Sequence, residues 1–387
     1  MKARGSIARR DFLAMSVAAG AVAASRSPAG TPAGRVLAKG RIGTLDVANR
    51  LVRSATAENA WRESEMTEEG LGLYRGLAAG GVGLVITGYM GVTRDGRASD
   101  TMTLISEDRF VPGLRRIAAV VHETRKDCKV VAQLGHVGLQ TTVSEPVGPT
   151  TTAWPKLKAK PRALTAEEVE GIVASFAQAA RRAREAGFDG VQLHGAHGYL
   201  LSAFLSPFTN TRTDRYGGSL EKRVTVIREI VDQARPLVGP DFPILIKVNG
   251  DDFVAGGTDI ESFPQLASAI EKAGVQAVEV SGNSPVRENV GPDEQSYFLK
   301  YAQKLRLGVP VILTGGNRSL ERLEKIAEAG IPAFFGLARP LLREPDLPAR
   351  WREGRGAPEA TCISCNRCIR AFGKGLVTRC RVDEADV

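Results

Sequence analysis

The sequence predicts an α/β fold, a TIM (β/α)8 barrel with a short C-terminal cysteine-rich extension. Short runs rich in Val, Ile and Leu alternate with longer stretches of helical period, which is typical of repeated βα units. Eight such runs occur, at residues 50–53, 83–87, 129–133, 190–193, 243–248, 277–280, 310–314 and 333–335. The alternative, an open doubly wound sheet, is disfavoured because no Gly-x-Gly-x-x-Gly motif opens a helix after the first run.

The start of the chain, residues 1–26, is expected to be an export signal. Arg9 and Arg10 precede an uncharged, weakly apolar run at 14–25, and a twin arginine before such a run indicates the twin-arginine route. This route carries folded proteins, so we expect a periplasmic location. A chance arginine pair or an uncleaved leader is the alternative. Residues 27–40, rich in Pro and Gly, are expected to form a linker.

The remaining chain is long enough for a barrel over residues 41–350 and an extension over 351–387. The formal net charge of +9 is partly carried by the leader, and no Lys/Arg block lies beside aromatic residues. We therefore expect no nucleic-acid partner. No stable membrane span is expected, because the leader's apolar run is only about a dozen residues long. The oligomeric state is not readable from the sequence.

Helices are expected between the apolar runs. Their periodicity places them at residues 110–124, 165–186, 220–237, 260–273 and 319–329. Three of these stretches end in Ala-Gly, at 186–187, 273–274 and 329–330. Glycine at this position commonly ends a helix, so each pair should lead directly into the next strand.

The functional site is expected at the carboxyl ends of the barrel strands, because that face carries the chemistry of this fold. Gly315 and Gly316 follow the seventh run, and Gly336 and Arg339 follow the eighth. Free backbone N–H groups and a bidentate cation together predict a phosphate-binding site. For the glycine pair alone, a tight turn is the alternative.

The end of the fourth run has the most informative motif of the chain, His194-Gly-Ala-His197-Gly-Tyr199. Two imidazole donors beside a phenol are suited to holding and protonating a polarised oxygen substrate. A structural histidine pair or a zinc site is the alternative, although His-x-x-His without a third ligand is a weak metal signal.

This motif, together with Phe204-Leu-Ser-Pro and the tract 212–221, resembles the signature of the old yellow enzyme family, which comprises FMN-dependent ene-reductases and NADH:flavin oxidoreductases on a TIM barrel. The resemblance covers nearly the whole mature chain. It implies that His194 and His197 hold a substrate oxygen over the flavin and that Tyr199 is the proton donor. The further residues that it implies for FMN are Ala55, Thr56, Ala57, Gly88, Gln133 at the pyrimidine edge, Lys247 near N1–C2=O, and Gly315, Gly316, Gly336 and Arg339 at the phosphate.

One position departs from the family pattern. Many relatives have Thr or Cys where this chain has Ala57, and that residue bonds the flavin O4. Ala57 cannot make this contact. Thr56 is adjacent, but neighbouring strand residues face opposite sides. The flavin potential and the preferred substrate are therefore left open.

The extension contains Cys362, Cys365, Cys368 and Cys380, a spacing that indicates a [4Fe-4S] cluster. It resembles the tail of the 2,4-dienoyl-CoA reductase and trimethylamine dehydrogenase branch, where such a cluster exchanges electrons with FMN. A four-thiolate zinc site, an empty site and two disulfides are the alternatives. Because the chain stops at Val387, we expect a cluster here to need an external redox protein partner.

The sequence thus predicts an FMN-dependent oxidoreductase that reduces an activated C=C or related conjugated acceptor in a small-molecule substrate. Electrons would come from NAD(P)H or from a redox partner through the cluster. One alternative is an amine or small-molecule dehydrogenase that passes electrons from FMN to the cluster. The other is a non-redox TIM-barrel isomerase or phosphate-ligand binder.

Overall fold

The computed structural model describes residues 34–155, 157, 160–283, 287–291 and 293–384. These residues form one compact unit. The expected export signal, and the linker up to residue 33, lie outside the described residues. Within the described part of the chain, no helix is both long and apolar enough to cross a bilayer.

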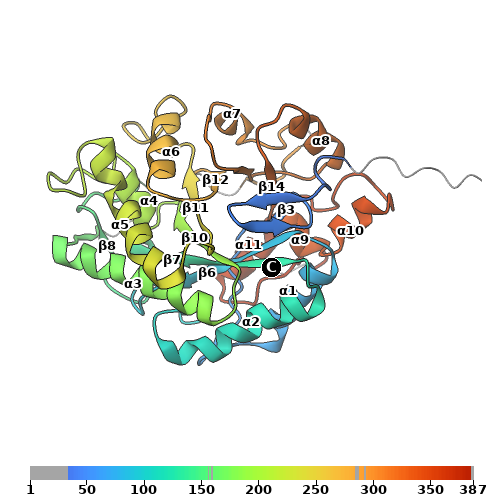
Figure 1. The fold of residues 1–387 in the computed structure, drawn as a ribbon, viewed down its shortest axis with the longest axis horizontal. Coiled ribbons are helices and arrows are strands. Elements are labelled where there is room, and N and C mark those ends of the chain that lie inside the picture. Colours follow the sequence, from blue (N-terminus) through green and yellow to red (C-terminus); the bar gives the residue numbers. More distant parts are fainter. Residues whose placement is uncertain (1–33, 156, 158–159, 284–286, 292, 385–387) are drawn as a thin grey trace, which may run out of the picture. The chain divides into compact units, whose positions relative to one another are not determined.

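Eight parallel strands close into a barrel, as expected (Figure 1). All eight coincide with the apolar runs of the sequence, so the predicted fold class is confirmed. The strands are β3 (Leu51–Arg53), β6 (Leu84–Gly91), β7 (Lys129–Gly135), β10 (Gly190–Gly195), β11 (Ile244–Asn249), β12 (Val278–Ser281), β13 (Val311–Leu313) and β14 (Phe334–Leu337). Their order around the barrel follows the chain, and β14 pairs with β3 to complete the ring.

Helices surround the barrel on its outside (Figure 1). The five expected helices are present as α2 (Val111–Thr124), α3 (Ala166–Glu185), α5 (Leu220–Val238), α6 (Phe263–Lys272) and α8 (Leu320–Glu328). Shorter helices are α4 (Leu200–Leu205), α7 (Leu299–Ala302), α9 (Arg339–Arg343), α10 (Leu347–Arg352) and α11 (Arg367–Gly373).

Helix α1 (Glu68–Ala79) was not expected from the sequence. Three glycines, at 70, 72 and 76, lower its intrinsic helix propensity. The helix forms because Thr67 caps its first turn and its buried face includes Leu71, Tyr74 and Leu77. A Cβ at Gly70 would lie 2.4 Å from the sulfur of Met66, so close packing requires glycine there.

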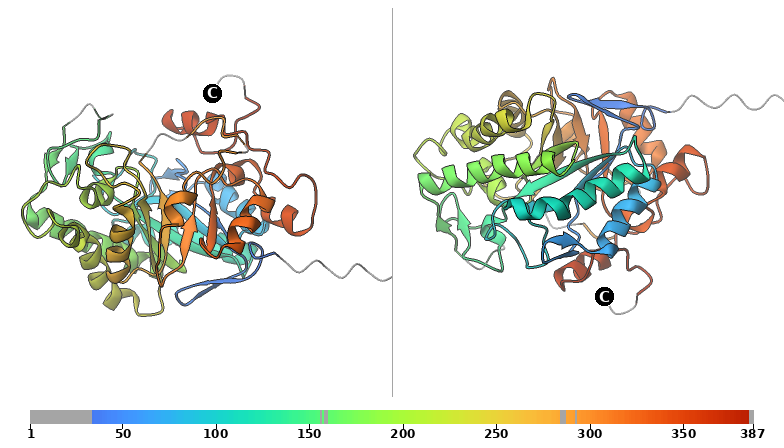
Figure 2. Two further views of the ribbon diagram at one scale, coloured as in Figure 1. Left: turned by 90° about the horizontal axis from the view of Figure 1, so that it is seen from above. Right: turned by 60° about the horizontal axis from the view of Figure 1, so that its bottom comes forward.

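A hairpin of β1 (Gly40–Ile42) and β2 (Leu45–Val47) lies at the end of the barrel opposite to α11 (Figure 2). Its apolar residues pack against strand residues such as Val52, Leu245 and Ile312. The amino-terminal end of the barrel interior is therefore closed by an apolar plug. The carboxyl-terminal end is left for the site, beneath the extension.

Candidate functional site

Two joined cavities open at the carboxyl ends of the strands. The larger is about 660 Å³ and the smaller about 220 Å³. They share Ala55, Thr56, His197, Tyr199 and Lys247 as lining residues. Most of the expected site residues therefore lie around one continuous space.

The motif after β10 forms one wall of this space. The ring of His194 lies 5.1 Å from that of His197 and 4.8 Å from that of Tyr199, centroid to centroid. The Tyr199 hydroxyl donates to that of Tyr89 at 3.3 Å. His197 has a left-handed backbone, with φ +61, which turns the chain back so that all three side chains meet.

Burial determines the protonation of this wall. It lowers the pKa of His197 to about 3, with a further contribution from the Lys247 ammonium. The pKa of His194 is likewise lowered well below its ordinary value, first by burial and then by His197 and Lys247. Burial raises the pKa of Tyr199. At neutral pH the wall thus presents uncharged imidazoles and a protonated phenol.

Two contacts at this wall were missed by the sequence reasoning. His197 Nε2 lies 2.7 Å from Ser281 Oγ, and its backbone N–H donates to Asn249 Oδ1 at 2.9 Å. Both partners stand at the ends of neighbouring strands, β12 and β11. In contrast, Nδ1 of His194 is buried with no hydrogen-bond partner in the part of the chain that the structure describes. A buried ring nitrogen without a partner is costly, so an incoming polar ligand atom would be favoured there.

Gln133 and Lys247 lie at the floor of the smaller cavity. Gln133 donates from Nε2 to the side-chain oxygen of Gln192 at 2.7 Å. Lys247 forms a buried ion pair with Glu279 at 3.0 Å and donates to Ser54 Oγ at 2.8 Å. The expected pyrimidine-edge residue and the expected cation are therefore held by a hydrogen-bonded layer below them.

The residues of the expected phosphate-binding site, called the phosphate grip below, line the larger cavity: Gly315, Gly316, Gly336 and Arg339. Gly315 and Gly316 have positive φ values of +96 and +78, and Gly336 and Arg339 lie on the neighbouring strand end. A Cβ on Gly315 would lie 2.6 Å from the ring of Tyr297. Glycine at this position therefore allows the Tyr297 ring to pack closely against the backbone, in addition to forming the turn.

Arg318 is a second cation of this grip that the sequence reasoning missed. It lines the larger cavity, and its Nε is buried with no hydrogen-bond partner among the described residues. Its Nη1 donates to the carbonyl of Cys362 at 2.8 Å. Its position two residues after the glycine pair was a usable signal, because a residue that follows a phosphate-binding turn can reach the same anion.

A model of the NADH:flavin oxidoreductase / NADH oxidase family matches residues 41–357 of the chain. The chain belongs to this family. The old yellow enzyme resemblance of the central motif is thereby confirmed, and the protein is an enzyme of the NADH:flavin oxidoreductase type. FMN and NAD(P)H are typical of this family.

Named relatives extend this family placement. The chain is 38% identical to "Metal reductase" of Desulforamulus reducens over 84% of its length, and 36% identical to "NADH oxidase" of Thermoanaerobacter brockii over 90%. It spans 50% and 56% of these relatives, about half of their length. A "4,4'-dithiodibutanoate disulfide reductase" of Rhodococcus erythropolis is 30% identical, with 92% of this chain and 96% of the relative covered.

Two solved structures share the fold of this oxidoreductase and part of its sequence. A 2-naphthoyl-CoA reductase complex aligns with a TM-score of 0.83 and 26% identity, over 89% of this chain and 56% of that one. Histamine dehydrogenase from Rhizobium sp. 4-9 aligns with a TM-score of 0.77 and 26% identity, over 89% and 52%. The placement near the dienoyl-CoA reductase and trimethylamine dehydrogenase branch agrees with these neighbours.

The cavities of this oxidoreductase fit FMN in their donor set. At one end, Arg318, Arg339 and the glycine turn are suited to a phosphate. At the other end, Lys247 can face the N1–C2=O region, and Gln133 can pair with the pyrimidine edge. The unpartnered Nε of Arg318 is a buried donor that an anion would satisfy.

The three expected flavin residues that follow β3 line the cavities, whereas the expected flavin residue Gly88, in β6, does not. Ala55, Thr56 and Ala57 all line the smaller cavity. The Thr56 hydroxyl donates to the carbonyl of Ser54 at 3.2 Å. Gly88 lines neither cavity. It lies in a β-bulge, and its N–H donates to Glu58 at 2.6 Å, so its backbone serves a local ion-pair network instead.

The extension forms part of the cavity wall, which the sequence did not reveal. Ile369 and Phe372 of α11 line the smaller cavity opposite the histidine wall, together with Thr378. Asn59 donates to the carbonyl of Phe372 at 2.9 Å and so holds this segment to the loop after β3. Trp154, from the insert after β7, lines the larger cavity and donates to the carbonyl of Gly198 at 2.9 Å.

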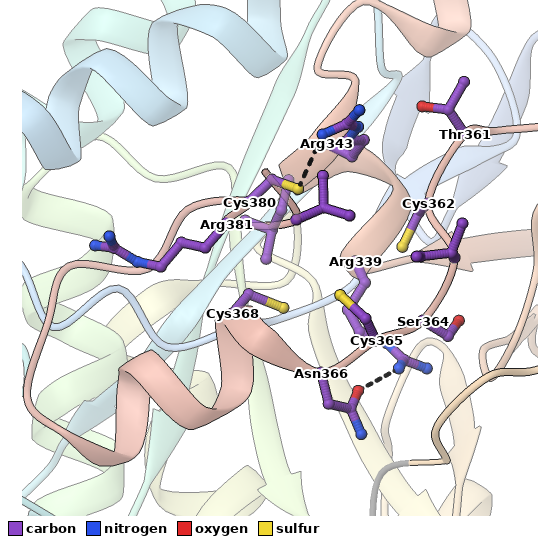
Figure 3. A pocket seen from close by; sticks show the side chains of 13 residues that line it. Arg339, Arg343, Thr361, Cys362, Ser364, Cys365, Asn366, Cys368, Cys380 and Arg381 are labelled. Carbon is purple, nitrogen blue, oxygen red and sulfur yellow. Dashed lines mark hydrogen bonds between the residues drawn. The ribbon is translucent and has the colours of Figure 1, made fainter. Parts of the chain in front are cut away.

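The four cysteines of the extension surround a separate small cavity (Figure 3). Cys362, Cys365, Cys368 and Cys380 are all free thiols, and their sulfurs lie around a common space. Burial raises the pKa of both Cys362 and Cys368. These sulfurs would therefore become thiolates only with a compensating cation or metal centre.

The four thiols that line this cavity are the ligand type of both iron–sulfur clusters and structural zinc sites. In the part of the chain that the structure describes, no three His, Cys, Asp or Glu side chains lie close enough to share a single ion. Arg339 and Cys368 line both this cavity and the flavin cavities, so the two sites adjoin.

Proposed function

We propose that this enzyme reduces an activated C=C bond, or a related conjugated acceptor, in a small-molecule substrate at FMN. The observation that carries the proposal is the wall of His194, His197 and Tyr199. His197 and Tyr199 line the same cavity as the phosphate grip, and His194 lines the smaller cavity that adjoins it. It combines neutral donors with a protonated phenol at the place where a substrate would lie.

The roles of these residues follow from their protonation. Bound FMN supplies the hydride chemistry of the family. When one alkene carbon gains a hydride, negative charge develops on the conjugated oxygen. The neutral imidazoles of His194 and His197 stabilise that charge by hydrogen bonding. Tyr199 then gives its proton to the second alkene carbon, so the product has gained one hydride and one proton.

Tyr199→Phe tests this assignment. The variant should slow the oxidation of reduced enzyme by substrate and spare flavin reduction by the donor, measured separately by stopped flow. Tyr89→Phe is the matched control, because it removes the hydroxyl that contacts Tyr199 and leaves the proposed acid in place. Equal losses in both half-reactions of Tyr199→Phe would contradict the proposal.

For the extension we propose a [4Fe-4S] cluster that delivers electrons to FMN from NAD(P)H-independent sources, such as a redox protein. The proposal is supported by Cys368, which lines both the cysteine cavity and the flavin cavity. Anaerobically purified protein should contain iron and acid-labile sulfide, and Cys365→Ser should remove both. Zinc, or intact disulfides, would contradict this part of the function.

The reverse direction is a second candidate, an amine or small-molecule dehydrogenase that passes electrons from FMN to the cluster. The observation that favours it is the structural similarity to a histamine dehydrogenase. The two directions differ in what reduces the flavin. Anaerobic bleaching by amines but not by NAD(P)H would select the dehydrogenase.

We also propose that residues 1–26 direct export to the periplasm by the twin-arginine route. The support is the Arg9–Arg10 pair before an uncharged run. Mass spectrometry of the mature N-terminus tests it, with Arg9→Lys/Arg10→Lys as the export-deficient variant. An intact leader on periplasmic protein, or unchanged export of the variant, would contradict the proposal.

A further inference from the structure

A polar layer crosses the barrel interior directly below the flavin cavities. Ser54, Gln133, Gln192, Lys247 and Glu279 all point into it, and each is at most 2% exposed. The interior of this fold is ordinarily filled by branched apolar side chains. Burying five polar side chains is costly unless every group is paired, so this departure calls for a functional reason.

Glu279, on β12, connects the members of this layer. One carboxylate oxygen accepts from Lys247 at 3.0 Å and from the Ser54 hydroxyl. The other accepts from Gln192 Nε2 at 2.8 Å. Strand register explains the ion pair, because Lys247 and Glu279 are direct neighbours on β11 and β12. Glu279 itself lines neither cavity, so it can act on a ligand only through its neighbours.

The negative charge of Glu279 fixes the direction of a hydrogen-bond chain. A carboxylate accepts only, so Gln192 must turn its amide nitrogen toward Glu279. Its oxygen then faces Gln133, which donates from Nε2 at 2.7 Å. Gln133 is thereby left with its oxygen and one N–H for the cavity. This donor–acceptor pair matches the N3–H and carbonyl groups of a flavin pyrimidine edge.

We propose that Glu279 is a positioning residue that sets both the local charge beside the flavin and the amide orientation of Gln133. This inference rests on the proposed FMN site. The carboxylate compensates the Lys247 ammonium, so the pair presents little net charge to the N1–C2=O region. Without Glu279, the uncompensated ammonium would stabilise the anionic reduced flavin more strongly than the oxidised flavin.

Glu279→Gln is the decisive variant, because it removes the charge and keeps the shape. We expect the midpoint potential of the bound flavin to shift to more positive values, measured by dye-coupled spectroelectrochemistry at pH 6 and pH 8. Glu279→Asp keeps the charge and should restore a potential near that of the unaltered protein. A purely structural role would lower thermal stability in both variants without this separation.

Gln192→Met separates the effect of Glu279 on the local charge from its effect on the orientation of the Gln133 amide. It breaks the chain to Gln133 but leaves the Lys247–Glu279 ion pair. We expect the dissociation constant of FMN to rise about tenfold, the size of one lost hydrogen bond, with a smaller change in potential than in Glu279→Gln. Asp189→Asn is the matched control, since Asp189 pairs with His122 and Lys129 at the other end of β10.

The outcomes distinguish this inference from the proposed function. If the natively purified protein without substitutions contains no flavin, the proposed function fails. If it contains FMN and Glu279→Gln leaves the potential unchanged at both pH values, only the role of Glu279 is overturned. A shift of the same size in Asp189→Asn would also overturn it.

Discussion

The buried side chains at the two ends of the flavin cavity differ in charge. At the histidine end, burial removes charge, so His194 and His197 are neutral and Tyr199 keeps its proton. At the arginine end, Arg318 and Arg339 are each only 8% exposed, and arginine keeps its charge under burial. The first end is suited to neutral proton and hydrogen-bond donation, and the second to a permanent anion.

The ends also differ in what holds them. The histidine end is built from one short motif after β10, supported by strand-end residues such as Asn249 and Ser281. The arginine end depends on the extension, because Arg318 donates to the carbonyl of Cys362 and Arg339 donates to the Asn366 side chain. These contacts couple the phosphate-binding end of the cavity to the cysteine cavity.

The largest expected effect concerns the proton donor of the histidine end. Loss of a general acid costs roughly a hundredfold to ten thousandfold in rate. We expect the Tyr199→Phe variant to fall in this range for substrate reduction, while its FMN content stays unchanged. Reduced FMN content in this variant would show that the histidine end also holds the cofactor. The two ends would then not differ in function as described above.

At the arginine end, Arg339→Ala should weaken FMN binding by roughly tenfold to a hundredfold, the contribution of a charge-assisted hydrogen bond. Arg318→Ala should act in the same direction. Fluorescence titration of FMN into apoprotein measures both. Arg343→Ala is the control, because it lies on the same helix but lines only the cysteine cavity. Equal weakening in the control would contradict a specific phosphate grip.

Acid stability tests the neutral state of the histidine end. The folded pKa of His197, about 3, lies below the unfolded value of about 6.5. Between these values the unfolded state binds more protons, so stability falls as the pH drops below 6.5. His197→Asn should remove up to about 1.4 kcal/mol of this loss per pH unit. Urea unfolding at pH 6.5, 5.5 and 4.5 gives the free energy of unfolding at each pH. If this free energy changes with pH equally in the variant and the unaltered protein, a buried neutral His197 is contradicted.

The smallest effect concerns the attachment of the extension. Asn59→Ala removes the hydrogen bonds to the carbonyls of Phe372 and Leu376 and should destabilise this segment by about 1 kcal/mol. Limited proteolysis should then cut α11 faster, with the barrel intact. Loss of FMN in step with the cleavage would show that cofactor binding also depends on α11, which lines the smaller cavity.

The sequence placed His194, His197 and Tyr199 at one strand end, and their side chains do lie together, because the motif is contiguous. The eight strands were also predicted, because buried parallel strands are continuous apolar runs. Helix α1 was missed because its three glycines lower its helix propensity, and the packing that stabilises the helix is not visible in the local sequence. Glu279 and Phe372 were missed for another reason: their roles depend on neighbours distant in the chain, and no local pattern marks them. Arg318 was also missed, although it follows the glycine pair closely in the sequence.

The visible spectrum of the natively purified enzyme, before and after anaerobic addition of NADH or a reduced donor, is the most direct test of a flavin in this cavity. We expect a yellow protein whose flavin absorption is bleached by a donor and restored by an activated alkene. We also expect that the flavin, once released, is FMN. A colourless protein that takes up no FMN would contradict a cavity built for this cofactor between the histidine and arginine ends.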